Sequence, residues 1–172
     1  MKNQYKKALY LIRHAKSDWA DSSLADIDRP LNQRGYRDAH AMAKELKAKG
    51  VMPDIIVTSP AIRAMSTAMI FVEELQFPEN QVIINKSLYE SSAENLVNQL
   101  LTFHEEAKTV FLFGHNPSIS QVANLLTEVR IDEVPTCGIV GVGFRENSWK
   151  ATDSGFLILF DQAHLAVVCH FN

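Results

Sequence analysis

Five side chains suited to chemistry each follow a short apolar run of the sequence. Arg13 and His14 come directly after the first run, and Arg63 follows the second by a few positions. Glu90 comes after the third run, and His115 comes after the fourth. If the runs are parallel strands of one open sheet, their carboxyl ends share the edge at which such sheets bind ligands. We therefore expect the five side chains to converge.

This set of side chains suits phosphoryl transfer. Guanidinium groups are permanently charged planar forks that match the oxygens of a phosphoryl group. A neutral imidazole can attack phosphorus and form a covalent intermediate, while a second imidazole donates a hydrogen bond. A carboxylic acid can protonate the leaving group and later activate water. Because cations would already be in place, we expect neither a metal nor a cofactor.

The apolar runs that precede these residues are typical of buried strands. Four strands are expected over residues 8–12, 54–58, 82–84 and 109–113. Three more are expected over 138–144, 156–160 and 165–169, with turn residues between them. Strands of this kind would hold the five side chains at a single edge.

Apolar residues at helical spacing predict a helix after each of the first four strands. The first helix should begin after Asn32, which is a suitable N-cap, and end at Gly50. The third should run from 92 to about 105. The apolar faces of the second and fourth helices are expected at Ile62, Met65, Met69 and Val72, and at Ile119, Val122, Ala123 and Leu126.

Four β-α units predict a mainly parallel sheet with helices on both faces. The last three strands are expected to add antiparallel edges. The predicted fold class is α/β, a three-layer α/β/α sandwich with antiparallel strands near the C-terminus. The 172 residues contain no linker, internal repeat or composition break, so we expect one domain over 1–172.

Four stretches resemble signatures of the histidine phosphatase superfamily, which is also called phosphoglycerate-mutase-like. The first reads Leu-Ile-Arg-His-Ala-Lys-Ser over 11–17 and is similar to the family's R-H-G signature. The second runs from Arg29 through Gly35, and the third from Thr58 to Thr67. The fourth is Phe-Gly-His-Asn-Pro over 113–117. The short chain and the form R-H-A-K-S are similar to the phosphohistidine phosphatase (SixA-type) branch.

The resemblance implies a role for each residue of the set. It makes His14 the nucleophile that becomes a phosphohistidine, and it makes Arg13, Arg63 and His115 the groups that bind phosphoryl oxygens. Glu90 fits the place of the general acid that some relatives carry, and it also fits an exposed acid at the start of a helix. Ala15 departs from the family pattern, because it stands where Gly is usual and narrows the room near the phosphate.

Two nearby residues and one motif need separate interpretations. Ser17 could cap a turn or bind phosphate, and we expect it to bind phosphate. Arg29 is expected to hold its own loop. The stretch Asp26-Ile27-Asp28 resembles the D-x-D of aspartyl phosphatases, but it lies in a loop rather than after a buried strand. We therefore expect no catalytic role for it.

Composition and charge exclude several classes of protein. Lys and Arg total 17 against 20 Asp and Glu, a net charge of −3, which argues against a nucleic-acid partner. The sequence shows neither a signal peptide nor an apolar stretch near the roughly 18 residues of a membrane span. Two cysteines are too few for a disulfide scaffold or a Cys-rich zinc site. We expect a cytoplasmic protein without metal or membrane partner.

The sequence as a whole predicts a metal-independent phosphatase that works through a covalent phosphohistidine. The expected partner is a phosphorylated protein that carries phosphohistidine, as in a signalling phosphorelay, and the product is inorganic phosphate. Two alternatives stay open: a general phosphomonoesterase for small molecules, and a phospho-ligand binding module without turnover. A mutase is a more distant alternative.

Overall fold

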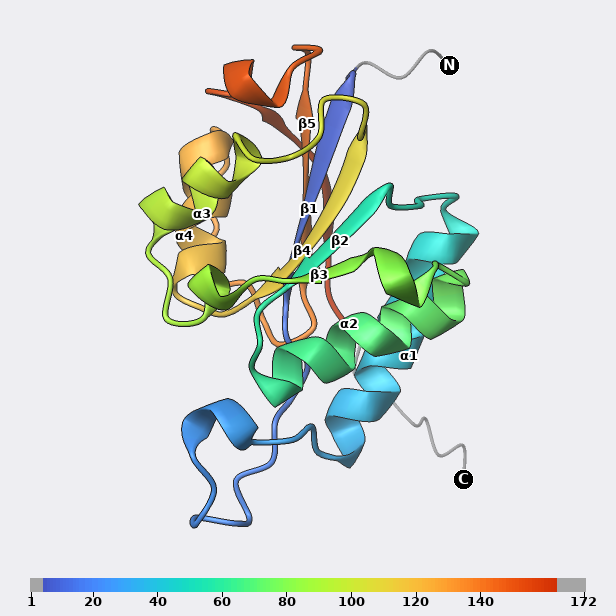
Figure 1. The fold of residues 1–172 in the computed structure, drawn as a ribbon, viewed down its shortest axis with the longest axis vertical. Coiled ribbons are helices and arrows are strands. Elements are labelled where there is room, and N and C mark those ends of the chain that lie inside the picture. The colour runs from blue at the N-terminus through green and yellow to red at the C-terminus, as the bar shows by residue number, and fades with distance from the viewer. Residues whose placement is uncertain (1–4, 164–172) are drawn as a thin grey trace, which may run out of the picture.

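The computed structural model describes residues 5–163, in which six strands form one sheet in the order β3-β2-β4-β1-β5-β6 (Figure 1). The four strands β1 to β4 run parallel to one another, and β5 and β6 add antiparallel pairs. The strands are β1 (Lys7–Arg13), β2 (Ile55–Thr58), β3 (Val82–Ile84), β4 (Thr109–Gly114), β5 (Ile139–Phe144) and β6 (Phe156–Asp161). This confirms the predicted mixed sheet, while the strand expected over 165–169 lies outside the described residues.

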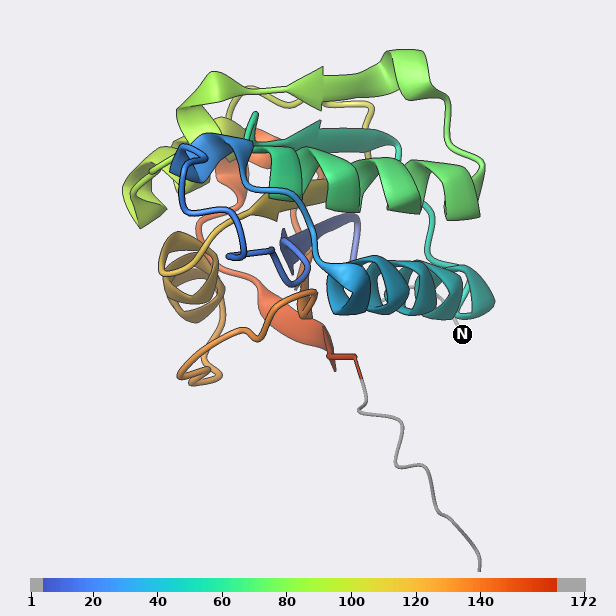
Figure 2. The same cartoon turned by 90° about the horizontal axis from the view of Figure 1, so that it is seen from below.

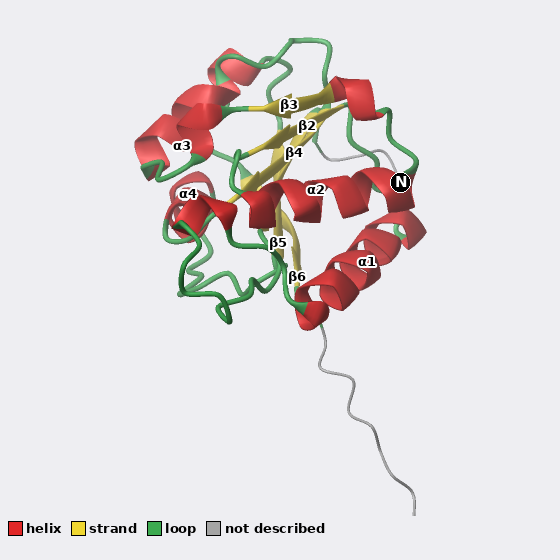
Figure 3. Ribbon diagram, turned by 60° about the horizontal axis from the view of Figure 1, so that its bottom comes forward, coloured by secondary structure: helices red, strands yellow, loops and turns green. Residues whose placement is uncertain are grey.

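Four α-helices within the described part cover the two faces of the sheet. The helices α1 (Gln33–Ala48) and α2 (Ile62–Leu75) lie on one face, and α3 (Ala93–Leu100) and α4 (Ser118–Leu126) lie on the other (Figure 3). Each face has its own hydrophobic cluster. Residues 8–12 of β1 are therefore buried on both sides, which explains their continuous apolar sequence. The predicted α/β/α sandwich is confirmed.

Of the apolar face predicted for α2, only Val72 is buried. Met69 is 38% exposed and Met65 is only partly buried, whereas Ala64, Ala68 and Phe71 are fully buried. The two alanines are small, so the helix can lie close against the sheet. Periodicity alone could not separate the two faces, because both carry apolar residues.

The third helix ends earlier than predicted. It stops at Leu100 rather than near 105, and Leu101 is 49% exposed. The N–H groups of Leu101, Thr102 and Phe103 each donate to the carbonyl three residues earlier, so the chain tightens into turns. His104 consequently lies in an exposed loop.

The carboxyl ends of β1 to β4 gather five connecting segments at one edge of the sheet. Four of these segments, over residues 14–32, 59–61, 85–92 and 115–117, each follow one of the parallel strands. The fifth, over 127–138, arrives there because β5 is antiparallel and Ile139 pairs with Ile12. Figure 2 looks onto this end and shows segment 14–32, in blue, beside the start of α2.

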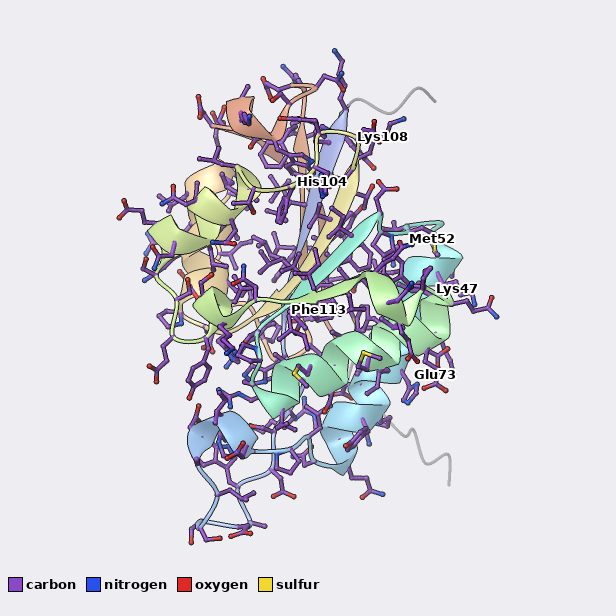
Figure 4. All side chains as sticks on the ribbon, viewed as in Figure 1. Lys47, Met52, Glu73, His104, Lys108 and Phe113 are labelled. Carbon is purple, nitrogen blue, oxygen red and sulfur yellow. The ribbon has the colours of Figure 1, made fainter. Side chains whose placement is uncertain are left out.

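The opposite end of the sheet carries none of these segments. Lys108 and Met52 lie there, far from segment 14–32, while Phe113 is buried between the layers (Figure 4). No helix within residues 5–163 is both long enough and apolar enough to cross a membrane.

Candidate active site

His14 is fixed between three segments immediately after β1. Its backbone N–H donates to the carbonyl of Gly114 at 3.1 Å, and its own carbonyl accepts from the N–H of Cys137 at 3.1 Å. Its ring Nδ1 lies 2.8 Å from the carbonyl oxygen of Ala15, and its Nε2 lies 3.3 Å from Nε of Arg63. Both partners fix the tautomer, because a carbonyl can only accept and a guanidinium can only donate. The proton therefore sits on Nδ1, and Nε2 carries a lone pair.

The environment keeps this ring neutral. Burial lowers the pKa of His14 from 6.5 to about 3, with a smaller contribution from the charges of Arg63 and Arg13. The hydrogen bond to Ala15 opposes this shift without reversing it. A neutral imidazole whose Nε2 carries no proton is the form that attacks phosphorus.

Arg63 reaches His14 from the first turn of α2. Its side chain is only 7% exposed. Besides its contact with His14, it donates from Nη1 to the carbonyl oxygen of Asp26 and from Nη2 to Oδ2 of Asp26 at 2.9 Å. A single arginine thus joins the end of β1 to the loop before α1.

Asp26 connects more side chains of the site than any other residue of its loop. Its Oδ1 accepts from Nη2 of Arg29 at 2.6 Å, and its Oδ2 accepts from Arg63 and from the Tyr89 hydroxyl, both at 2.9 Å. Desolvation raises the pKa of this carboxyl, but the hydrogen bonds from Arg29, Tyr89 and Arg63 outweigh it and hold the pKa well below its usual range. Asp26 is therefore a charged anchor for two guanidinium groups.

Arg13 contacts a different segment of the chain from this network, namely residues 133–134. Its Nη1 donates to Oε1 of Glu133 at 2.7 Å and to the carbonyl of Val134 at 2.8 Å. Its Nε is buried and has no hydrogen-bond partner. One edge of the guanidinium is therefore occupied, while the Nε donor is free.

His115 faces His14 at a ring-centroid distance of 5.2 Å. Its Nε2 lies 2.8 Å from Oγ of Ser59, and this Oγ already accepts from the N–H of Ala61. A hydroxyl oxygen has one proton and two lone pairs, so Ser59 can donate to Nε2 or accept from it, and both tautomers of His115 fit this contact. Burial, and then the Arg63 charge, lower the pKa of His115 to about 4.

The Nδ1 atom of His115 is buried without a partner, as is Nε of Arg13. Within residues 5–163, these are the only two buried side-chain nitrogen or oxygen atoms in that condition. Buried polar groups normally have hydrogen-bond partners, so these two buried nitrogens without partners point to a ligand that would bind them. Both belong to residues in direct reach of the loop that carries His14. A phosphoryl group accepts hydrogen bonds, so it is a suitable partner for the Nε–H of Arg13 and, in the tautomer that carries the proton on Nδ1, for His115.

One further polar residue, Thr67, holds the chain that carries His14. The Thr67 hydroxyl accepts from the N–H of Ala15 at 3.0 Å and donates to the carbonyl of Arg63 at 2.7 Å. Ala15 is fully buried, and its methyl belongs to the hydrophobic cluster under α1 and α2. The methyl is therefore accommodated by the core.

Ser17 and Glu90 do not join the group around His14 by any hydrogen bond. The Ser17 hydroxyl accepts from Nη1 of Arg29 at 3.1 Å, so it holds the loop. Glu90 is exposed and has a left-handed backbone with φ of 53°. It takes part in none of the hydrogen bonds or ion pairs of the described residues. Its neighbour Tyr89 lies beside His115 instead, with the two ring centroids 5.9 Å apart in an edge-to-face arrangement.

Sequence reasoning assigned no role in the site to three residues that shape it: Asp26, whose D-x-D stretch was expected to have no catalytic role, and Tyr89 and Glu133. Asp26 had one local signal, since it precedes Arg29 by three residues and forms an ion pair with it. Tyr89 and Glu133 had no signal in the sequence, because each acts on a partner that is distant along the chain. Cys137 is buried, and burial raises the pKa of its thiol, so it is not a second nucleophile.

Comparisons with known proteins place this arrangement in context. A model of the histidine phosphatase superfamily (branch 1) matches residues 9–100. An uncharacterized chloroplastic protein of Arabidopsis thaliana is 32% identical over 152 residues, which are 84% of this chain and 69% of that protein. A 2,3-bisphosphoglycerate-dependent phosphoglycerate mutase of a Methylobacterium species is 37% identical over 86 residues. That match covers 49% of this chain and 41% of the mutase.

Solved structures share the fold over nearly the whole chain. The protein histidine phosphatase SixA, in complex with tungstate, has a TM-score of 0.79 at 19% identity and covers 91% of this chain and 97% of its own. A mycobacterial glucosyl-3-phosphoglycerate phosphatase has a TM-score of 0.67 at 16% identity, covering 91% and 99%. At these identities the likeness shows the fold alone.

Proposed function

Since the chain belongs to the histidine phosphatase superfamily (branch 1), as its sequence signatures predicted, we propose that it is a phosphatase with His14 as the nucleophile. The observation that carries this proposal is the presence of two buried nitrogens without a hydrogen-bond partner, Nε of Arg13 and Nδ1 of His115, in residues that adjoin or face the neutral His14. A phosphoryl group has acceptor oxygens that suit these nitrogens when they carry protons. Arg63 adds a third donor group at the attacking nitrogen.

The first chemical step forms a bond between Nε2 of His14 and phosphorus. The bond from phosphorus to the leaving atom breaks, and its electron pair goes to the leaving atom, which takes a proton from solvent. Arg13, Arg63 and His115 stabilise the charge on the phosphoryl oxygens. The N-terminus of α4, two residues beyond Asn116, adds partial positive charge to the same region.

The second step returns the enzyme to its starting state. A water oxygen attacks phosphorus, the P–N bond to His14 breaks, and its electron pair returns to Nε2. The water gives up its proton to solvent, and inorganic phosphate leaves. The guanidinium groups supply the positive charge that these steps require, so we propose turnover without a metal ion.

The substrate that we favour is phosphohistidine on a protein. Glu90 is exposed, and none of the hydrogen bonds between described residues joins a carboxylate to His14 or His115. A P–O monoester leaves as an alkoxide and needs an acid, whereas the imidazole of a P–N donor is a better leaving group. The site therefore suits P–N cleavage. General phosphomonoesterase activity is the second candidate.

The test is phosphate release from phosphoramidate, set beside an alkyl phosphomonoester, with and without chelator. We expect chelator-resistant release that favours phosphoramidate, is abolished in His14→Ala, and changes less than threefold in Glu90→Gln. The matched control is His40→Ala, because His40 lies on α1 and pairs with Glu74. Release in which the monoester dominates and Glu90→Gln is strongly impaired would favour the phosphomonoesterase. Phosphate binding without release would favour a binding module.

A further inference from the structure

The Glu133 carboxylate is paired with Arg13, the residue that precedes His14. Its Oε1 is 2.7 Å from Nη1 of Arg13. The side chain of Glu133 is 68% exposed, whereas that of Arg13 is 19% exposed. The exposed carboxylate of Glu133 thus places a negative charge beside the guanidinium that we propose binds phosphate.

The segment that carries Glu133 is fastened to α4 and to the turn before it. The Val134 N–H donates to Oγ of Ser120, and the Val134 carbonyl accepts from Nδ2 of Asn116, both at 2.9 Å. Asn124 exchanges two hydrogen bonds of 2.7 Å with the backbone of Ile131. Glu133 therefore projects from an anchored stretch of chain.

Glu133 can remain paired with Arg13 while a phosphoryl group is bound. It occupies only Nη1, which it shares with the Val134 carbonyl. The free Nε lies on another edge of the guanidinium. A phosphoryl oxygen can therefore bind at Nε without displacing Glu133, so the substrate meets the negative charge of this residue.

A carboxylate also accompanies the second arginine, because Asp26 is bound to Arg63. Arg13 and Arg63 are thus each paired with a carboxylate, which partly neutralises their charge. A substrate with one phosphoryl group still finds free donors. A substrate with a second negative group must place that group near carboxylates.

We propose that Glu133 determines specificity by selecting against phosphoryl donors that carry a second anionic group. Donors whose leaving group is neutral or cationic, such as a phosphorylated histidine in a basic segment of protein, are favoured. This inference rests on the proposed phosphatase activity. Two like charges about 7 Å apart, at an effective dielectric constant of about 40 for a solvent-exposed carboxylate, repel by an amount that corresponds to about a five- to tenfold change in kcat/KM.

The experiment compares two phosphomonoesters of similar size, phosphoethanolamine with its ammonium group and 3-phosphoglycerate with its carboxylate. Wild-type protein should prefer phosphoethanolamine. Glu133→Gln keeps an acceptor for Arg13 and removes the charge, so we expect the ratio of the two kcat/KM values to fall five- to tenfold. Glu133→Lys should lower the ratio further. Added salt should reduce the wild-type ratio and leave that of Glu133→Gln nearly constant.

The matched control is Asp132→Asn, which removes a charge from the adjacent residue. Asp132 is 90% exposed and pairs with Arg130 instead of Arg13. We expect its ratio to stay within twofold of the wild type. An unchanged ratio in both Glu133 variants, with release still dependent on His14, would overturn this inference. Absence of release from phosphoramidate and from both esters in the wild type would overturn the proposed function instead.

Discussion

The charge on Asp26 keeps two arginines together that would otherwise repel each other. Arg29 and Arg63 approach the same carboxylate from different segments, and Tyr89 binds the oxygen that Arg63 uses. Arg29 also stacks on the ring of Trp19 at 3.5 Å from the ring centroid. A carboxylate that meets these donors fixes the direction from which Arg63 reaches His14. Asp26 is therefore a positioning residue.

Asp26→Asn is expected to lower kcat for phosphoramidate by roughly ten- to a hundredfold, because small misplacements of a group at the reacting atoms have effects of that size. KM should change less, since Arg13 and His115 still bind the phosphoryl group. Steady-state kinetics would check this split. Asp28→Asn is the matched control, because Asp28 lies exposed in the same short turn. Equal kcat values in Asp26→Asn and wild type would contradict the positioning role.

At the residue scale, the sequence predicted the residues that follow strands better than the residues that support them. His14, Arg13, Arg63 and His115 are brought together because each follows the carboxyl end of a parallel strand. The supporting contacts of Asp26 and Glu133 join residues 37 and 120 positions apart. The spacing of residues along the sequence does not predict contacts between such distant residues, so these contacts are seen only in the folded structure.

The start of α1 positions the loop that follows His14. Asn32 caps the helix by accepting from the N–H of Gly35 at 2.8 Å, and its own N–H donates to the carbonyl of Lys16 at 3.0 Å. A Cβ atom on Gly35 would lie 2.2 Å from that carbonyl oxygen. Only a glycine allows the first turn of α1 to approach residue 16 so closely.

The substitution Gly35→Ala tests whether helix propensity or close packing dominates at this position, because the two change the free energy of unfolding in opposite directions. Propensity alone would stabilise the protein by about 1 kcal/mol. The overlap with the Lys16 carbonyl should instead lower the free energy of unfolding by about 1–3 kcal/mol. Urea unfolding measures this value, and Ala41→Gly at an exposed site of α1 measures propensity in the same helix. A Gly35→Ala protein more stable than wild type would contradict the packing argument.

At the element scale, the strands were predictable because both faces of the sheet are covered and the central runs are purely apolar. The helix α2 was harder, since Arg63 and Thr67 lie on its buried side. These two polar residues can be buried because their side chains form hydrogen bonds with residues of the site. The helix therefore departs from a simple amphipathic pattern where it contributes to chemistry.

At the scale of the whole molecule, the two buried histidines of the site lower the stability of the folded protein below neutral pH. The unfolded rings of His14 and His115 take up protons below their ordinary pKa of 6.5, but the folded rings remain neutral until about pH 3 and pH 4. The unfolded state then binds more protons than the folded state. Stability must therefore fall as the pH falls from 6.5 toward 4.

His115→Asn should make the stability of the protein less sensitive to acid. Each histidine contributes about 1.4 kcal/mol per pH unit within its window, so the variant should lose that much of the slope between pH 6 and pH 5. Urea unfolding at several pH values gives the two slopes, and carboxylates that titrate in both proteins cancel in the comparison. Equal slopes would show that the folded His115 ring titrates like the unfolded one.

The backbone carbonyl of Val134 links the part of the site at the end of β1 to the part at the end of β4. The Val134 oxygen accepts from Nη1 of Arg13 and from Nδ2 of Asn116, and Asn116 adjoins His115. A displacement of residue 134 would break both bonds in one event. The arginine at the end of β1 and the histidine turn at the end of β4 would then loosen together, and probes placed on either one would report the same opening rate.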